Sequence, residues 1–361
     1  MKKLFLLAAA VCGSVQFSPA CTGISLFAAD SSYVQARTIE WAQSALESRY
    51  VIIPRGQSFT SLTADGKGGK MFTARYGVAG MSVVRPEFMA EGINEVGLSA
   101  GLFFFPGYGG YLPFDERHRE HSLADLQVVQ WMLCSFATVD EVMAGFGQVR
   151  VAGLVPESTV HWRIGDKSGR QVVLEIVNGT PRFYENTVGV LTNAPGFEWH
   201  LTNLKNYINL QPGDAQGMRM GGVALRPLGA GSGLLGLPGD ATPPSRFVRA
   251  AFYRATAPQR ATAFEPVMQC FHLLDNFNVP IGSEHPMGKA PDIPSATQWT
   301  SAIDLTHGKI YYHTAYNRSI RCIDLGGIDF GRVAYQSHPL DSSPVQPIET
   351  VQIGQTDSGD Q

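Results

Sequence analysis

The sequence predicts an α+β fold built from separate layers of strands and helices. Strand patterns begin the chain and return towards its end, and helical patterns lie between them. Strands and helices do not alternate regularly, so a parallel sheet made of βαβ units is not expected. No internal repeat and no linker rich in Pro and Ser divides the chain, which predicts a single domain over residues 21–341.

A hairpin is predicted at the beginning of this domain. Residues 23–27 and 33–38 have strand-like composition and are separated by a turn of Asp and Ser residues. Because the second strand of a hairpin runs back along the first, Arg37 and Glu40 are expected to lie close to Cys21.

Helices and further strands follow. Ser122 resembles an N-terminal cap, and apolar residues recur at spacings of three and four from Leu123 to Phe136, which predicts a helix. More helices are predicted at 138–146, 243–255 and 265–274. The other strands are expected at 160–164, 171–176, 299–305 and 309–315. From Ser342 the chain is polar and contains prolines, so residues 342–361 are predicted to be a loose tail.

Residues 1–20 have the organisation of a signal peptide. Two lysines are followed by an apolar run at 4–11 and by small residues at 18–20. The apolar run is too short to span a bilayer, which takes about 20 residues. We therefore expect cleavage before Cys21, a mature protein that is periplasmic or secreted, and no stable membrane span.

Cleavage at this point would make Cys21 the first residue of the mature chain. A thiol with a pKa of about 8.5 would then stand beside an α-amine with a pKa of about 7.7 to 8, so one residue would supply both nucleophile and base. One alternative is that Cys21 is only a small residue near the cut. The other is an exported lipoprotein or binding module that carries lipid on Cys21, although Ser18 stands where a lipobox usually has Leu.

The composition excludes some classes of function. With 28 basic and 31 acidic residues the formal net charge is −3, and removal of Lys2 and Lys3 with the leader makes it −5. Nucleic acid is therefore not an expected partner. Aromatic residues make up 10% and charged residues 16% of the chain, which indicates a compact enzyme or binding protein rather than a disordered chain.

The spacing of cysteines and histidines does not suggest a metal site. Four cysteines follow the leader, far apart and without a C-x-x-C pair: Cys21, Cys134, Cys270 and Cys322. His118 and His121 lack a third ligand, so we expect neither a metal nor an organic cofactor. Cys134 and Cys270 lie in apolar segments and are predicted to be buried thiols, with one disulfide as the alternative.

Four polar residues are candidates for chemistry. A cation at Arg37 would favour a thiolate, and a carboxylate at Glu40 would hold the α-amine; the alternative is a structural ion pair. The amide of Asn193 is suited to donate to an oxyanion; the alternative, which the residue alone favours, is that it caps a turn. Arg246 follows a glycine-rich stretch at 229–240 that lacks the features of a phosphate loop, and it could lie on the surface or point into a site.

A run of aromatic residues among glycines is the candidate for substrate binding. It includes Phe103, Phe104, Phe105 and Tyr108. Such a segment suits a loop that lines an apolar pocket, and the alternative is a core strand with an aromatic cap.

These pieces, in this order, resemble the choloylglycine hydrolase family, which includes bile salt hydrolases and penicillin V acylases and belongs to the N-terminal-nucleophile hydrolases. The similarity covers nearly all of the chain after the leader. It is carried by Cys21-Thr22-Gly23, by Arg37-Thr38-Ile39-Glu40-Trp41, by Leu191-Thr192-Asn193-Ala194-Pro195 and by the segments 91–98 and 237–247.

The resemblance implies a four-layer αββα sandwich, no cofactor and often a homotetramer. It implies Cys21 as nucleophile and base, Arg37 as the residue that tunes the thiol, Asn193 as oxyanion donor and Arg246 as the organiser of the charge network. The expected substrates are small-molecule amides: glycine- or taurine-conjugated bile salts first, phenoxymethylpenicillin second and acyl-homoserine lactones third.

Two positions depart from the family pattern. Glu40 stands where the family commonly has Asp to hold the α-amine. Phe103 stands where bile salt hydrolases typically have Asn, so an oxyanion donor at this position would have to be a backbone N–H. The aromatic residue looks more like the penicillin acylase branch.

Overall fold

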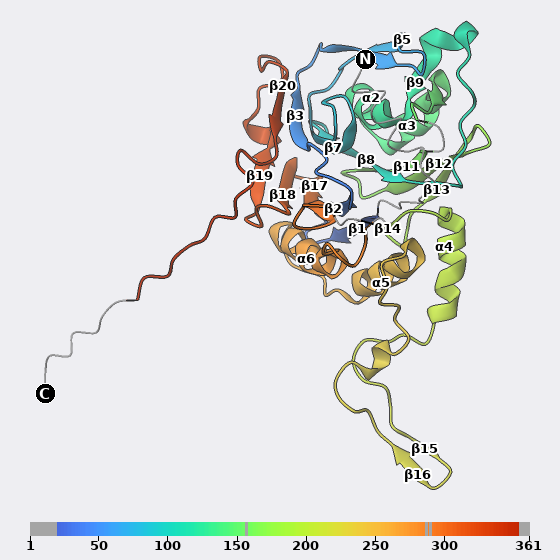
Figure 1. Cartoon of the computed structure of the whole chain (residues 1–361), viewed down its shortest axis with the longest axis vertical. Helices are drawn as coiled ribbons and strands as arrows, with labels where there is room; N and C mark the ends of the chain where they lie inside the picture. Colours follow the sequence, from blue (N-terminus) through green and yellow to red (C-terminus); the bar gives the residue numbers. More distant parts are fainter. Residues whose placement is uncertain (1–19, 156–157, 286–287, 289–290, 354–361) are drawn as a thin grey trace, which may run out of the picture.

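Two antiparallel sheets stacked face to face form the centre of the molecule (Figure 1). The computed structural model describes residues 20–155, 158–285, 288 and 291–353, so most of the predicted leader lies outside the described residues. The first sheet has six strands in the order β14-β1-β2-β17-β18-β19. Their bounds are β1 (Cys21–Phe27), β2 (Tyr33–Glu40), β14 (Val190–Leu191), β17 (Thr297–Asp304), β18 (Lys309–Thr314) and β19 (Arg321–Asp324).

The second sheet has eight strands in the order β13-β12-β11-β8-β7-β6-β3-β20. Their bounds are β3 (Arg49–Ile53), β6 (Val78–Ser82), β7 (Met89–Asn94), β8 (Leu98–Phe104), β11 (Val160–Asp166), β12 (Gln171–Val177), β13 (Thr180–Glu185) and β20 (Gln336–Pro339). Three small two-stranded sheets pair β4 (Ser58–Leu62) with β5 (Gly68–Thr73), β9 (Ser122–Ala124) with β10 (Arg150–Ala152), and β15 (Met218–Met220) with β16 (Val223–Leu225).

Helices cover the outer face of each sheet. Helices α5 (Pro243–Thr256) and α6 (Phe264–Leu274) pack on the first sheet, and α2 (Val128–Ser135) and α3 (Val139–Gly145) pack on the second (Figure 1). Helix α4 (Phe197–Leu204) lies beside α5. The result is the αββα sandwich that the family resemblance implies, and the predicted α+β class is confirmed.

The first hairpin is the one that the sequence predicts. Strands β1 and β2 pair with Cys21 opposite Ile39 and Gly23 opposite Arg37. The two sheets approach closely at Gly23, because a Cβ atom there would lie only 2.7 Å from the ring of Phe103. Glycine at this position therefore lets the strand that begins at Cys21 pack directly on the second sheet.

The other predicted helices and strands are present within two residues of their expected bounds. The helix predicted from Ser122 is wrong at its beginning: Ser122–Ala124 form β9, and helix α2 begins only at Val128. The backbone of this segment is used by tertiary partners, since Ala124 N–H donates to Ser61 Oγ at 2.8 Å and the strand pairs with β10. Long-range pairing therefore overrides the local helical pattern.

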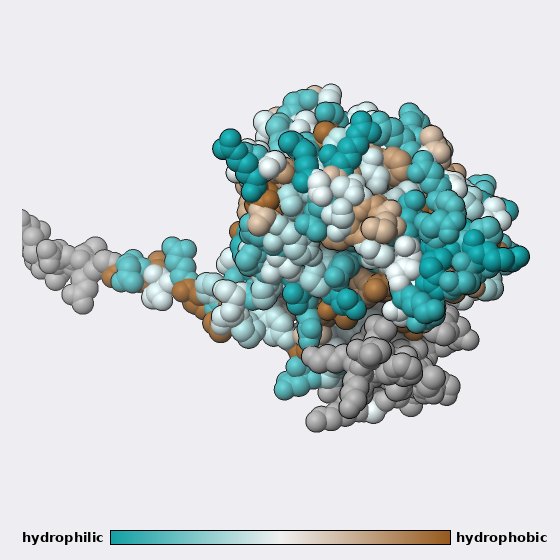
Figure 2. Space-filling model, turned by 90° about the horizontal axis from the view of Figure 1, so that it is seen from above, coloured by the Kyte–Doolittle hydropathy of each residue, from teal (hydrophilic) through white to brown (hydrophobic). Residues whose placement is uncertain are grey.

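Two segments extend from the sandwich. The β15–β16 hairpin projects away from the body, and all six of its strand residues are exposed (Figure 1). Residues 342–353 have no helix or strand and leave the body with hydrophobic side chains among hydrophilic ones (Figure 2). No helix in the described part of the chain has the length and apolar character needed to cross a membrane.

Candidate active site

Cys21 begins β1 and lies between two neighbouring strands. Strand β14 pairs with β1 so that Leu191 faces Gly23, and continuing this antiparallel register brings Asn193 level with Cys21. The backbone nitrogen of Cys21 donates to Asn193 Oδ1 at 2.8 Å. Only 3% of the Cys21 surface is exposed in the full-length chain. Asn193 is therefore a contact of Cys21 and not a residue that caps a turn at a distance from it.

Arg246, in the first turns of α5, points into this site. Its guanidinium donates to Asn193 Oδ1 at 2.7 Å and to Thr22 Oγ1 at 2.9 Å, and it also donates to the carbonyl of Cys21. Pro243 begins α5, where a fixed φ suits the first helical turn and no N–H is needed. Of the two positions that the sequence left open for Arg246, the surface one is excluded.

Arg37 lies between the two sheets and is fully buried. Its guanidinium donates to the carbonyls of Ala90 and Leu102 and lies 4.1 Å from the centre of the Phe103 ring. Its carboxylate partner is Glu91 on β7 at 3.5 Å, and not Glu40 on its own strand. The alternative of an ion pair between Arg37 and Glu40 is therefore wrong.

Glu91 is shared with a second buried arginine. Arg163 on β11 donates to the other oxygen of Glu91 at 2.7 Å and to the carbonyls of Ile24 and Ala36. Two guanidinium groups and one carboxylate leave this cluster with an excess of one positive charge. Of these two arginines, Arg37 lowers the pKa of the Cys21 thiol, whereas the charge of Arg163 lowers the pKa of Cys270.

The pKa of the Cys21 thiol depends on several neighbours. Burial raises it above its ordinary value, and the charge of Glu40 acts in the same direction. The positive charges of Arg37 and Arg246 lower it, and so does a hydrogen bond from the backbone N–H of Phe104. The site therefore opposes the cost of burying a thiolate with two cations and one backbone donor.

Glu40 is buried on the face of the first sheet that α5 and α6 cover. Its Oε1 accepts a hydrogen bond from Thr297 Oγ1 at 3.2 Å, and its Oε2 has no partner among the described residues. Burial raises its pKa to about 8, while the charge of Arg246 opposes that rise. The backbone N–H of Glu40 donates to the carbonyl of Ala20, the residue just before Cys21. Glu40 is therefore paired with the chain at the predicted cleavage point.

The four predicted substrate-binding aromatics have different surroundings. Phe103 and Phe105 are completely buried; Phe103 lies beneath the Arg37 guanidinium, and Phe105 stacks on an imidazole at 4.3 Å. Phe104 is half-buried, and its carbonyl accepts from Asn193 Nδ2 at 2.8 Å. Tyr108 is 52% exposed. The substrate-binding role remains a prediction, and Phe104 and Tyr108 are the two with exposed surface.

Several residues at the site were not found from the sequence. Glu91 begins one of the motifs that carry the family resemblance, so a signal for it was present. Arg163 and His161 have no local signal, because their partners come from distant strands. His200 lies only seven residues after Asn193, whose carbonyl it contacts, and that spacing alone does not indicate the contact. Glu284 was also missed; its charge raises the pKa of Glu40 and its own pKa is raised by burial.

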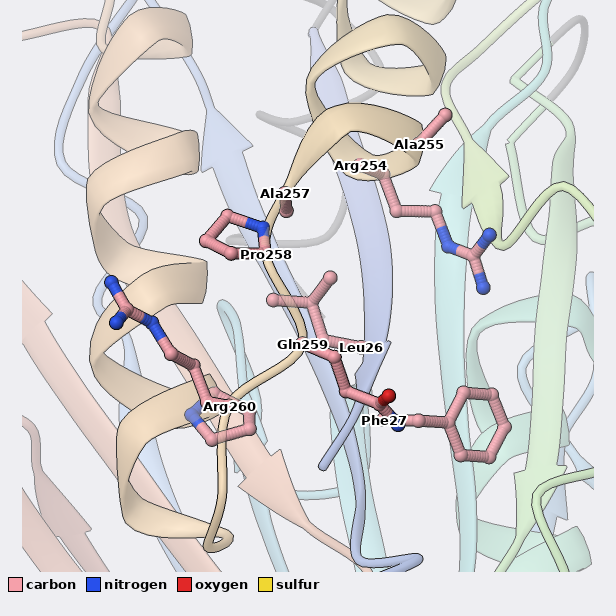
Figure 3. A pocket seen from close by; sticks show the side chains of 9 residues that line it. Leu26, Phe27, Arg254, Ala255, Ala257, Pro258, Gln259 and Arg260 are labelled. Carbon is pink, nitrogen blue, oxygen red and sulfur yellow. The ribbon is translucent and has the colours of Figure 1, made fainter. Parts of the chain in front are cut away.

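A surface pocket of about 220 Å³ lies elsewhere (Figure 3). Leu26 and Phe27 contribute to its wall from the far end of β1, roughly 15–20 Å along the strand from Cys21. The guanidinium groups of Arg254 and Arg260 point in opposite directions in this view and do not converge on one ligand group. The pocket shares no residue with the site at Cys21.

The remaining cysteines agree with their predicted positions. Cys134 and Cys270 are buried and free, and every cysteine in the described ranges is unpaired. Within those same ranges no group of three or more His, Cys, Asp or Glu side chains is arranged to hold a metal ion.

An αββα sandwich whose first strand begins at a buried cysteine, next to Asn193 and two arginines, defines an N-terminal-nucleophile hydrolase fold. Residues 21–333 match the model of the linear amide C–N hydrolases of the choloylglycine hydrolase family. The chain belongs to this family and is a hydrolase that acts on linear amides.

Similar proteins agree with this assignment. The chain is 32% identical over 312 residues to a bile salt hydrolase/transferase of Clostridium perfringens, covering 84% of this chain and 92% of that protein. It is 31% identical over 315 residues to a bile salt hydrolase/transferase of Bifidobacterium longum, covering 86% and 96%.

Solved structures have the same fold. A mutant of the conjugated bile acid hydrolase from Clostridium perfringens superposes with a TM-score of 0.80 at 28% identity, covering 92% of this chain and all of that one. The penicillin V acylase from Agrobacterium tumefaciens superposes with a TM-score of 0.70 at 22% identity, covering 89% and 92%, and this likeness concerns the fold alone.

Proposed function

We propose that this protein is an exported amidase with Cys21 as its nucleophile, which cleaves the amide between a bulky apolar acyl group and a small polar amine. The observation that carries the proposal is the hydrogen bond from the Cys21 backbone nitrogen to Asn193 Oδ1. It holds the atom that would become the free α-amine at the start of a strand, beside the thiol of the same residue.

Removal of the leader is the first step of this proposal. The match to the family begins at residue 21, and residues 1–20 have the charge and apolar pattern of a signal peptide. Intact-mass measurement of the exported protein tests this step. An unmodified chain that begins at Cys21 supports the amidase, whereas a diacylglyceryl group on Cys21 supports the lipoprotein alternative.

The reaction follows from a thiol and an amine on one residue. The α-amine takes the thiol proton, and the thiolate attacks the carbonyl carbon of the amide and forms a C–S bond. The C–N bond then breaks, and the α-ammonium returns the proton to the leaving amine. Water next adds to the thioester with the α-amine as base, which releases the acid and restores the thiol of Cys21.

The oxyanion needs donors beside the thiol. The backbone N–H of Phe104 is close enough to lower the pKa of Cys21, and it is one such donor. Asn193 Nδ2 gives one hydrogen to the carbonyl of Phe104, and its second hydrogen is the other donor in this proposal. Phe103 has no polar side-chain group, so a backbone donor takes the place of the Asn found in bile salt hydrolases.

Bile salts conjugated with glycine or taurine are the first proposed substrates. The relatives with 31–32% identity are named bile salt hydrolase/transferase, which supports this choice. Phenoxymethylpenicillin is the second, because Phe103 stands at a position where an aromatic residue resembles the penicillin acylase branch. Acyl-homoserine lactones are the third.

A product assay separates these substrates. Release of glycine, taurine, 6-aminopenicillanic acid and homoserine lactone from their amides is compared at equal enzyme concentration. The bile salt assignment predicts the highest kcat/KM for release of glycine or taurine. A higher value for 6-aminopenicillanic acid would move the assignment to the penicillin acylase, and hydrolysis of none of them would contradict the proposed function.

We also propose that the protein is a homo-oligomer, with a tetramer expected from the family. The β15–β16 hairpin exposes Met218, Met220, Val223 and Leu225 away from the body (Figure 1). An isolated two-stranded hairpin is at best marginally stable in water, so a second copy of the chain that covers these side chains would stabilise the hairpin.

Light scattering of wild type and of Val223→Asp tests the oligomeric state. We expect a smaller molar mass for the variant, and a monomeric wild type would contradict the proposal.

A further inference from the structure

Two buried histidines contact the backbone on both sides of the Asn193 side chain. His161 Nε2 lies 3.0 Å from the carbonyl oxygen of Thr192, and His200 Nε2 lies 3.0 Å from the carbonyl oxygen of Asn193. A carbonyl only accepts, so in both pairs the imidazole is the donor. These two contacts come from separate elements, since His161 is on β11 and His200 is on α4.

The rings of both histidines are fixed by stacking. The ring of His161 lies 4.3 Å from that of Phe105, with 7° between the planes. The ring of His200 lies 4.5 Å from that of Phe247, with 9° between the planes. Both histidines are fully buried. Stacking restricts each ring, so its Nε2–H can lie only within a narrow range of positions. A residue that positions another group needs this restriction.

The two histidines differ in their second nitrogen. Nδ1 of His161 faces Glu175 Oε1 at 3.3 Å, and this carboxylate also accepts from the backbone N–H of Phe197 at the beginning of α4. Each ring nitrogen of His161 therefore faces an oxygen atom. Nδ1 of His200 has no partner among the described residues. Burial lowers the pKa of His200 to about 4, which leaves a neutral ring that donates from Nε2.

The held segment carries the amide that contacts Cys21. Asn193 Oδ1 accepts from the backbone nitrogen of Cys21 and from Arg246, and Asn193 Nδ2 donates to Phe104. Both polar atoms of this side chain thus have hydrogen-bond partners, and the second hydrogen of Nδ2 has a fixed direction. A shift of the Thr192 or Asn193 carbonyl would move the amide relative to the Cys21 nitrogen.

We propose that His161 and His200 are positioning residues for Asn193: their hydrogen bonds to the two backbone carbonyls fix the amide against the Cys21 nitrogen. This inference rests on the proposed amidase function and adds two residues that act through Asn193 without touching substrate. A misplacement of reacting groups by about 1 Å can cost about 100-fold in rate, so loss of either hydrogen bond is expected to lower kcat.

The test separates the hydrogen bond from the packing of the ring. His200→Phe keeps an aromatic ring against Phe247 and removes the donor, whereas His200→Gln removes the ring and keeps an amide nitrogen near the position of Nε2. Positioning by the hydrogen bond predicts that kcat falls about 10- to 100-fold in His200→Phe and is largely retained in His200→Gln, with KM changed little in both. His161→Phe is expected to lower kcat in the same way.

His313 offers a matched control. It is buried on β18, its ring lies 5.3 Å from that of Phe271, and burial lowers its pKa to about 4 as well. The same substitutions at His313 are expected to lower the melting temperature without changing kcat. If His200→Phe keeps the kcat of wild type, or if His200→Gln loses more activity than His200→Phe, the inference is overturned.

Failure of the inference can be distinguished from failure of the proposed function. If Cys21→Ser is inactive and the His200 variants behave like the His313 variants, Cys21 remains the nucleophile and only the positioning role is lost. If Cys21→Ser retains activity, the proposed function itself fails. Alkylation of Cys21 by iodoacetamide, followed by mass spectrometry, must proceed in all histidine variants, because the thiol itself is unchanged.

Discussion

Arg37 on β2 pairs with Glu91 on β7 across the interface between the two sheets, at 3.5 Å. Glu40, which is on the same strand as Arg37, does not take part in this pair. The opposite sheet therefore supplies the anion that neutralises part of the buried charge, and Arg163 restores an excess of one positive charge. This arrangement leads to the first predictions.

Removal of Arg37 is expected to raise the pKa of the Cys21 thiol, because the positive charge of Arg37 lowers that pKa. In Arg37→Leu, the midpoint of the pH dependence of Cys21 alkylation by iodoacetamide moves to higher pH. Arg163→Leu is the matched control, since its charge lowers the pKa of Cys270 and is not among the causes of the shift at Cys21. Equal shifts in both variants would contradict a specific effect of Arg37.

Glu91→Gln is expected to destabilise the fold strongly. It leaves the Arg37 and Arg163 guanidinium groups buried without their anion, and breaking a buried ion pair of this kind typically costs about 3–5 kcal/mol. Glu95→Gln in the same motif is the control, because Glu95 pairs with the half-exposed Arg55 and such a pair contributes below about 1 kcal/mol. Urea unfolding of both variants measures the difference, and equal losses would refute the charge argument.

Gly101→Ala tests the space that the Glu91 carboxylate occupies. A Cβ atom at Gly101 would lie 2.0 Å from Glu91 Oε2, so the carboxylate or the strand must move. We expect a loss of about 1–3 kcal/mol in unfolding free energy, as for other overpacked cores, together with lower activity. Gly147→Ala is the control, since no atom lies within 4 Å of its added Cβ, and it should leave activity unchanged.

Glu40 predicts a dependence of stability on pH. Its pKa is raised from 4.5 to about 8 in the folded chain, so between these values the folded state binds a proton that the unfolded state has lost. The contribution of Glu40 to stability therefore decreases as pH rises through this window. Relative to wild type, the unprocessed Glu40→Gln variant should gain stability between pH 5 and pH 9, by up to a few kcal/mol, since one pKa unit corresponds to about 1.4 kcal/mol.

Thermal unfolding at pH 5, 7 and 9 gives the comparison for Glu40. In the processed protein the free α-ammonium of Cys21 would add a positive charge near this carboxyl group, lower its pKa and reduce the difference between wild type and variant. A difference that does not change with pH in the unprocessed chain would show that Glu40 is not the group responsible.

Cys21→Ser tests the nucleophile. The hydroxyl group has nearly the same size as the thiol but is much less acidic, so turnover should fall by about 1,000-fold or more while the fold is retained. Amide hydrolysis gives the activity, and circular dichroism with thermal unfolding gives the structural control. Near-normal turnover in a folded Cys21→Ser variant would exclude Cys21 as nucleophile.

The sequence by itself determined the elements close to Cys21. The strand pattern and the turn predicted a hairpin, and the length of its strands was enough to bring Arg37 back to the beginning of the chain. The motifs that begin at Cys21 and at Leu191 indicated the family and therefore the four-layer sandwich. These features depend on local composition and on residues that keep a fixed spacing, and both can be read along the chain.

The tertiary structure alone decided the partners of each charge. Arg37 pairs with Glu91, Arg246 points inward, and His161 contacts the segment of Asn193, because sheets and helices distant in sequence meet in one core. His200 is only seven residues from Asn193, and the fold of the chain into α4 brings its ring to the Asn193 carbonyl. The same packing makes Ser122 the first residue of a strand instead of a helix cap. Local patterns report how a segment can fold, whereas burial determines which neighbour must satisfy each polar group, and that neighbour is chosen by the whole fold.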